Sequence, residues 1–245
     1  MKIDNEKFNK GFSLFILAGM ATVLTITTLI KFRASGDPTD RLYLTISAIG
    51  AIAGILSTVC AANGKILTFL FGIIDVVIYS AMCIVSTRWG TAAMHILYLL
   101  PMQFVGIWQW KRRGSKDRKE IKARRLNGRQ RLLASGLFLL TSFVAYVILL
   151  QFDENAADTF IVAAVLSDAL VTVCNIFGQF LMSTAYMEQW IFWIGVNISS
   201  IVMWSIKMAE PDNSDFAIIY VVKYSFYLLN ALNGLRNWIR MSRNQ

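Results

Sequence analysis

The sequence predicts an all-α integral membrane protein with eight transmembrane helices, and three observations support this fold class. Of the 245 residues, 56% are hydrophobic and only 16% are charged, and the mean hydropathy of +0.53 exceeds that of soluble domains. The apolar residues gather in charge-poor stretches, each near the ~20 residues that a helix needs to cross ~30 Å of hydrocarbon. The basic residues gather between these stretches, mainly in alternate loops.

The predicted helices follow one another at 11–30, 42–62, 66–87, 89–110, 132–152, 159–182, 189–206 and 216–235. The first is a retained helix rather than a signal peptide, because its apolar length exceeds the usual ~7–15 residues and Lys31 and Arg33 follow it. The second carries Gly50 and Gly54 at GxxxG spacing, which favours close helix packing.

The polar content separates two helices from the other six. The first carries only Ser and Thr as polar residues, and the fifth is similar, with Ser135, Thr141, Ser142 and Tyr146 before Gln151 at its end. Ser and Thr can bond to their own helix backbone, so we expect both helices to be peripheral. The remainder forms two groups of three, each closed by a Gly and a Trp four residues later: Gly106 with Trp110, and Gly234 with Trp238. This similarity predicts a parallel repeat with the site at the interface between repeats.

The predicted organisation therefore has four parts. An extra N-terminal transmembrane helix lies in residues 1–40 and a first three-helix repeat in 41–110. A basic cytoplasmic loop and a linker helix occupy 111–157, and a second three-helix repeat occupies 158–245. Asp75 precedes Trp110 by 35 residues and Asn197 precedes Trp238 by 41 residues, and the additional residues of the second repeat fit its loop at 207–215.

The distribution of Lys and Arg predicts the orientation. The loops on the side of the termini hold 18 of these residues, 11 of them between Lys111 and Arg131, whereas the opposite side holds five. Positive loops stay cytoplasmic, so we expect a multi-pass protein of the cytoplasmic (inner) membrane with both termini inside. The net charge of +9 then reflects topology and contact with the lipid bilayer, not nucleic acid, because the basic loop lacks interleaved aromatic residues.

Several function classes are excluded by missing motifs. No nucleophile elbow, zinc-protease motif or phosphate-binding loop is present, so the chain is not expected to be an enzyme or an ATP-driven pump. Cys60, Cys83 and Cys174 are isolated in apolar segments, and His95 has no partner nearby in the sequence. We therefore expect neither a metal nor a cofactor.

Stripes of polar side chains along the helices mark the candidate binding site. Such residues are unfavourable in lipid and normally face protein or a cavity. The candidates are Asp75, Tyr79, Gln103, Trp108, Asp168, Asn175, Gln179, Trp190, Trp193, Asn197, Tyr224, Tyr227, Asn230 and Asn233. Two alternative roles compete with ligand binding. Amides can form hydrogen bonds between helices, and Trp at a helix end can be an interfacial anchor, which we favour for Trp110. Lys223 is expected to snorkel or to pair with an acid such as Asp168.

One stretch resembles a known family. Gln179-Phe-Leu-Met, followed by Glu188-Gln-Trp190-Ile-Phe-Trp193 and Asn197, is similar to the most recognisable part of the PnuC family of nicotinamide riboside transporters. The end of the fourth predicted helix also resembles this family, through Gln103, Gly106, Trp108 and Trp110. The end of the chain resembles the end of the family's sequence, through Asn233-Gly234 and Trp238. The likeness covers about 40–240. Gln189 replaces the more common Asn, and Asp75 stands where many members carry Asn.

The resemblance implies a 3+1+3 fold similar to SWEET sugar transporters. It also implies uptake of nicotinamide riboside by facilitated diffusion, with phosphorylation inside the cell trapping the product. In this hypothesis the ring stacks on Trp or Tyr while Gln103, Gln179, Asn197 and Asn230 bind the carboxamide and ribose. The alternatives are the same fold carrying thiamine, riboflavin or a sugar, and a non-transporting membrane receptor or scaffold. The oligomeric state stays open, with a homo-oligomer as one alternative.

Overall fold

The computed structural model describes residues 2–85, 89–114, 121–151, 159–208 and 214–243. Parts of the predicted loops 111–131 and 207–215 lie outside these ranges. The helices are α1 (Lys2–Ala34), α2 (Pro38–Ala62), α3 (Leu67–Val85), α4 (Trp89–Met94), the π-helix η1 (His95–Leu99), α5 (Leu100–Arg112), α6 (Gly128–Gln151), α7 (Thr159–Ser183), α8 (Gln189–Met208) and α9 (Ser214–Arg243). Each predicted segment is thus largely helical, with bounds that differ by a few residues at most ends.

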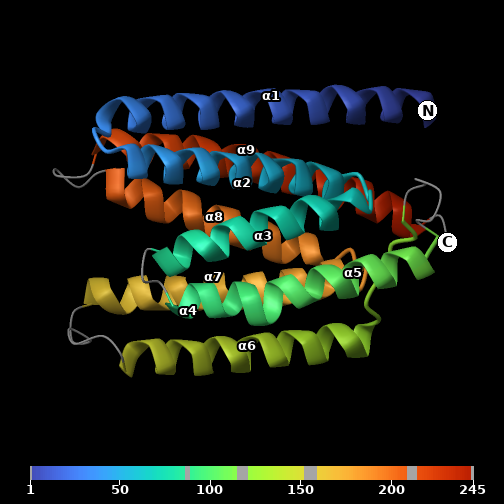
Figure 1. Cartoon of the computed structure of the whole chain (residues 1–245). Coiled ribbons are helices and arrows are strands. Elements are labelled where there is room, and N and C mark those ends of the chain that lie inside the picture. The colour runs from blue at the N-terminus through green and yellow to red at the C-terminus, as the bar shows by residue number, and fades with distance from the viewer. Residues whose placement is uncertain (1, 86–88, 115–120, 152–158, 209–213, 244–245) are drawn as a thin grey trace.

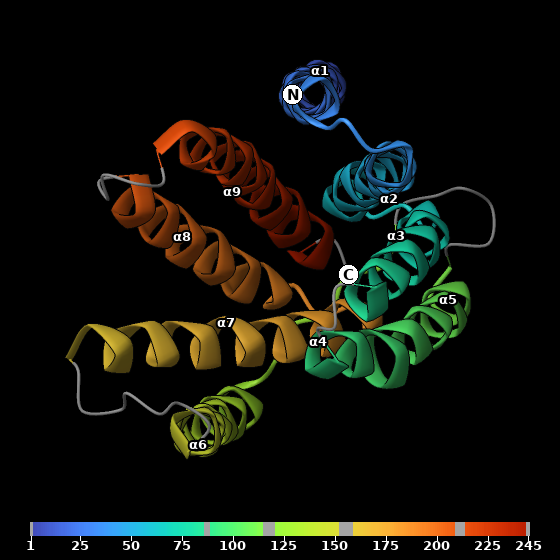
Figure 2. The same cartoon turned by 60° about the vertical axis from the view of Figure 1, so that its left-hand side comes forward.

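The helices form one elongated bundle (Figure 1). Within the described residues, α1, α2, α3, α6 and α7 are long and apolar enough to cross a membrane. α1 and α6 lie on opposite outer edges of the bundle in both views (Figures 1 and 2). In an apolar stretch of 18 residues, only 11% of α1 and 6% of α6 are buried inside the bundle, against 28–39% for the other three helices. The expectation that these two helices are peripheral is confirmed.

Local chemistry sets several helix ends. The side chain of Asp37 accepts a hydrogen bond from the backbone N–H of Thr39 at 2.8 Å, which caps α2, and Pro38 occupies its first turn. The π-helix η1 lies just before Pro101, which has no backbone N–H to donate to the preceding turn. The predicted fourth helix is therefore helical throughout 89–112, with a change of winding in the middle.

α2 and α7 end in the same conformation. Gly64 follows α2 with φ of +63°, and Ala185 follows α7 with φ of +65°. The backbone N–H of Lys65 returns to Cys60 O at 2.9 Å, and that of Tyr186 returns to Leu181 O at 2.8 Å. These are the left-handed caps that commonly terminate helices. Ala185 adopts the conformation that is more favourable for glycine.

Close contacts follow the predicted glycines. The side chains of Ile78 and Asp75 on α3 lie against Gly50 and Gly54 of α2, so the GxxxG pair does mark a tightly packed face. Both termini lie at one end of the bundle, where α5 ends and the chain leads into α6 (Figure 1).

Candidate functional site

Four aromatic rings fill the core near the ends of α2 and α7. Phe69 meets Trp110 edge-on with ring centroids 4.8 Å apart, Trp110 lies 5.5 Å from Trp238, and Trp238 lies 6.3 Å from Trp190. Phe69, Trp110 and Trp238 are fully buried, and Trp190 is 3% exposed. Interfacial anchoring, which we favoured for Trp110, is therefore wrong for that residue. Trp108, two residues earlier, is instead 50% exposed, and Arg112 stacks on its ring at 3.9 Å.

Trp110 and Trp238 make matching hydrogen bonds across the bundle. The indole N–H of Trp110 donates to Met182 O at the end of α7, and that of Trp238 donates to Ala61 O at the end of α2, both at 2.9 Å. Each third helix of the two predicted triplets is thus held to the first helix of the other triplet.

A series of contacts passes through three of the predicted site residues, Gln179, Trp190 and Trp193, and beside two others, Gln103 and Asn233. The amide of Gln179 donates to Ser183 Oγ at 3.1 Å, and Ser183 donates to the backbone oxygen of Met102, next to Gln103. On the other side, the ring of Trp193 lies against Gly178. One helical turn earlier on α8, the ring of Trp190 lies against Gly234, next to Asn233. Residues of α5, α7, α8 and α9 therefore form one contiguous set.

Several polar atoms in this region are buried without a hydrogen-bond partner. Among the described residues they include Gln103 Oε1, Trp190 Nε1 and both amide atoms of Gln189 and Asn233. These side chains are 0–7% exposed. An unsatisfied buried polar group costs roughly 1–3 kcal/mol, so native proteins keep few of them. We call Gln103, Gln189, Trp190 and Asn233 the unsatisfied cluster.

The unsatisfied cluster offers a particular chemistry. Amides both donate and accept hydrogen bonds, and an indole N–H donates one. The adjoining aromatic faces suit a flat, electron-poor ring. None of the four side chains of the unsatisfied cluster carries a charge. The cluster therefore suits a neutral polar solute, or one with a positive ring, better than an anion.

Other predicted residues use their polar groups within the protein. The amide of Asn230 donates to Thr58 O at 3.1 Å, which joins α9 to α2. The amide of Asn175 donates to Val171 O of its own helix. Asn197 is 8% exposed in α8. The alternative interpretation, hydrogen bonds between helices, thus describes Asn230 well.

Three candidates lie away from the buried region. Asp168 and Trp108 are exposed side chains. Tyr79 is also exposed, at 39%, and its ring lies 4.8 Å from that of His95. These positions face outward in the structure, where a membrane protein meets lipid or the headgroup region.

Asp75 and Lys223 place opposite charges within the bundle. The carboxylate of Asp75 lies against Gly54, and its charge interacts with that of Lys223 on α9. Lys223 also lies 5.8 Å and 5.7 Å from the ring centroids of Tyr224 and Tyr227. The acid whose charge interacts with Lys223 is therefore Asp75. Asp168, which we expected as a possible partner of Lys223, is exposed on α7.

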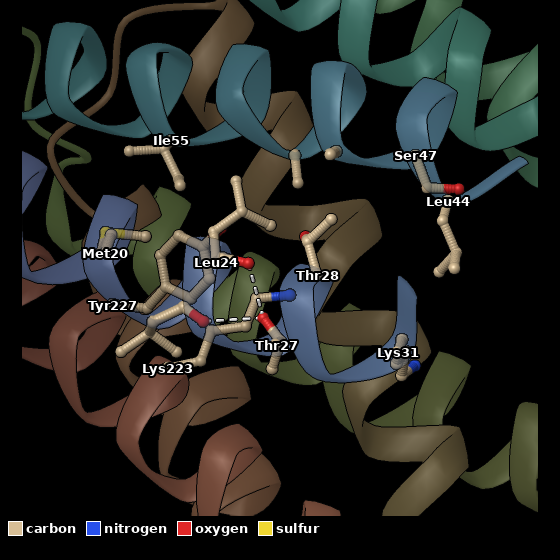
Figure 3. A pocket seen from close by; sticks show the side chains of 13 residues that line it. Met20, Leu24, Thr27, Thr28, Lys31, Leu44, Ser47, Ile55, Lys223 and Tyr227 are labelled. Carbon is tan, nitrogen blue, oxygen red and sulfur yellow. Dashed lines mark hydrogen bonds between the residues drawn. The ribbon is translucent and has the colours of Figure 1, made fainter. Parts of the chain in front are cut away.

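A cavity of about 200 Å³ lies between α1, α2 and α9 (Figure 3). Its wall is largely aliphatic, with Lys31, Lys223 and Tyr227 among its polar members. Thr27 also lines it, and its hydroxyl is turned back to Val23 O and Leu24 O. This cavity contains Tyr227 but none of the unsatisfied cluster, so it is a separate feature that α1 covers from outside.

Residues 121–127, which we call the connector, cross the end of the bundle. The backbone N–H of Ile121 donates to Gly64 O at 3.3 Å, and that of Arg124 donates to Ala185 O at 2.7 Å. The carboxylate of Glu188 accepts from the backbone of Leu126 at 3.1 Å and from Arg131 at 3.2 Å. The connector therefore bonds to the turn after α2 and to the turn after α7.

The sequence did not single out Gln189, Trp110 or Trp238 as site residues. Gln189 is fully buried and belongs to the unsatisfied cluster. It lies at the start of α8, off the face shared by Trp190, Trp193 and Asn197, so a stripe criterion misses it. The available signal was its place directly before Trp190 in the recognisable motif.

Comparisons with known proteins identify relatives of this chain. A family model described as nicotinamide mononucleotide transporter matches residues 44–240. The nicotinamide riboside transporter PnuC of Neisseria mucosa is 30% identical over 80% of this chain and 72% of its own length. The protein of the same name from Haemophilus influenzae is 30% identical over 80% of each chain.

A solved structure supports the same relationship. The crystal structure of the vitamin B3 transporter PnuC aligns with a TM-score of 0.67 and 27% identity, and the alignment covers 97% of this chain and 92% of that one. The chain therefore belongs to the PnuC family of membrane transporters.

Proposed function

We propose that this protein carries nicotinamide riboside across the cytoplasmic membrane. The observation that carries the proposal is the unsatisfied cluster beside the aromatic rings, whose donors and acceptors match a carboxamide and ribose hydroxyls. The names of the curated relatives from Neisseria mucosa and Haemophilus influenzae support the same substrate. Binding of the riboside would supply the hydrogen bonds that the buried amides lack.

The riboside is favoured over the mononucleotide named by the family model. A phosphate monoester carries one to two negative charges, and its burial without a cation is strongly unfavourable. The unsatisfied cluster itself provides no such cation. Selection against the phosphate would also keep a phosphorylated product inside the cell, so facilitated diffusion followed by phosphorylation would give net uptake.

Calorimetric titration of the purified protein tests this substrate assignment. We expect saturable binding of nicotinamide riboside, and binding at least about tenfold weaker for nicotinamide mononucleotide because its phosphate finds no partner. Thiamine, riboflavin and a simple sugar serve as comparison ligands for the same fold. Absence of binding heat with the riboside, together with tight binding of thiamine or another of these ligands, would contradict the assignment.

We also propose that the chain crosses the membrane eight times. Its two three-helix repeats run parallel to each other and are joined by α6. Matching contacts support the repeat: Phe69 lies over Gly106 in the first triplet as Trp190 lies over Gly234 in the second. Met182 precedes Trp190 by the same number of residues as Ala61 precedes Phe69, and the two accept the matching Trp bonds. Gly64 and Ala185 occupy equivalent places in this alignment and share a left-handed conformation.

This arrangement suggests how access would alternate. The unsatisfied cluster takes residues from both triplets, so rocking of one triplet against the other would open it to one side at a time. The connector holds the turns after α2 and α7 together at the end that carries both termini, the end that the positive charges assign to the cytoplasm. Opening toward the cytoplasm would therefore require these bonds to shift.

A further inference from the structure

A polar hollow, separate from the largely aliphatic cavity, lies at the end of α5 and is bordered mainly by basic side chains. Gln109, Arg112, Arg113, Gly114 and Lys122 line this open hollow of about 570 Å³. No carboxylate is among these lining residues. The hollow is bounded by the last turn of α5 on one side and by the connector, through Lys122, on the other. The hollow differs from the unsatisfied cluster in its charge, because the buried side chains of the cluster are uncharged.

Arg113 carries a donor with no acceptor. Its Nε is buried and has no hydrogen-bond partner in the structure. Partial desolvation and the neighbouring Arg124 guanidinium lower the pKa of Arg113, while Tyr186 acts in the opposite direction. Arginine stays charged under such shifts. A buried guanidinium N–H beside a second guanidinium is unfavourable unless an anionic oxygen accepts from it.

The described residues that line the hollow carry a net positive charge. Residues 115–120 are outside the described ranges, and by composition they add three basic and two acidic side chains. The carboxylate of Glu188, which bonds to the connector, already accepts from Leu126 and Arg131. By composition, the neighbouring segment 115–120 adds more basic than acidic side chains and so does not neutralise the hollow.

The hollow also lies where headgroups are expected. Trp108 is half exposed on the same turn of α5, and Arg112 is stacked on its ring. Exposed Trp near the end of a membrane helix marks the level of the headgroups, and basic pockets on the cytoplasmic side of membrane helices bind anionic headgroups. The chemistry required is a compact group with several anionic oxygens.

We propose that the hollow formed by Gln109, Arg112, Arg113 and Lys122 is a phosphate-binding site, occupied by the phosphate of an anionic lipid or of a soluble phosphate ester. Arg113 would donate its unpartnered N–H to a phosphate oxygen, and Lys122 would contribute charge from the connector. Because Lys122 belongs to the connector, an anion held between it and Arg113 would fasten α5 to the segment that joins the turns after α2 and α7.

Native mass spectrometry of the purified full chain in neutral detergent tests the site. The probes are phosphatidylglycerol and phosphatidylcholine, and the hollow variant is Arg113→Gln with Lys122→Gln. A matched variant, Arg129→Gln with Arg243→Gln, removes two exposed charges at the same end of the bundle but outside the hollow. We expect the wild type to prefer phosphatidylglycerol, the hollow variant to bind it about tenfold more weakly, and the matched variant to bind it as the wild type does.

Inorganic phosphate without lipid, read by thermal stabilisation, separates the two sources. Stabilisation that only the hollow variant loses, without preference for phosphatidylglycerol, would assign the site to a soluble phosphate ester. If the double variant fails to fold, Arg113→Lys and Lys122→Gln are used singly, and either should weaken the binding of one of these probes. Equal binding of every probe by wild type and hollow variants, or binding lost equally in the matched variant, would overturn the proposal.

Discussion

Replacement of Gln189 by methionine is expected to stabilise the protein and to weaken binding of nicotinamide riboside. Gln189 is fully buried, and neither of its amide atoms has a partner among the described residues. Methionine has nearly the same length and leaves no polar group unsatisfied, so the free energy of unfolding should rise by about 1 kcal/mol. Loss of the hydrogen bonds to substrate should weaken binding about tenfold or more.

The two effects are measured by thermal unfolding in detergent and by calorimetric titration with the riboside. Gln151→Met is the matched control, because Gln151 is exposed at the end of the peripheral helix α6, and it should leave both quantities unchanged. A less stable Gln189→Met variant with unchanged riboside affinity would show that Gln189 serves packing rather than binding.

Substitution of Trp110 or Trp238 by alanine is expected to destabilise the protein strongly. Both side chains are fully buried, and each donates a 2.9 Å hydrogen bond across the bundle. Truncation of a buried Trp costs roughly 3–5 kcal/mol, and the carbonyl of Met182 or Ala61 also loses its partner. The loss should be similar for the two residues, since they occupy equivalent places in the proposed repeat.

Trp108→Ala provides the control within the same helix. Trp108 is 50% exposed, so its truncation should cost less than about 1 kcal/mol. Denaturant or thermal unfolding of the three variants compares them directly. The rings of Trp110 and Trp238 are 5.5 Å apart, so the double variant should lose less than the sum of the single losses. A Trp238→Ala variant as stable as Trp108→Ala would contradict the proposed equivalence.

The positions of the helices were largely predictable, because a long apolar stretch indicates both the length of a membrane-spanning helix and the contact of its side chains with lipid. The segment 189–206 matches α8 closely at both ends, and 42–62 matches the end of α2. The peripheral place of α1 and α6 followed from apolar spans whose polar residues are mostly Ser, Thr and Tyr. The Gly106–Trp110 and Gly234–Trp238 pairs were visible in sequence, and both meet aromatic rings in the core.

The contacts of individual polar residues were less predictable, because a stripe does not reveal which neighbour it faces. Trp108 and Trp110 differ by two positions, so they lie on different faces of the helix, and the sequence alone could not identify the buried one. Gln103, Gln179 and Asn233 are each buried, whereas Asp168 is exposed on the same helix as Gln179. Gln189 became a candidate only through its burial without partners.

The most direct test of the central claim is uptake of labelled nicotinamide riboside into liposomes that contain the purified protein. Without an internal kinase, the riboside should equilibrate and then stop, since facilitated diffusion creates no gradient. With a riboside kinase and ATP enclosed, label should accumulate as the phosphorylated product above the external concentration. Tight riboside binding without entry into either kind of liposome would contradict transport and favour a non-transporting receptor.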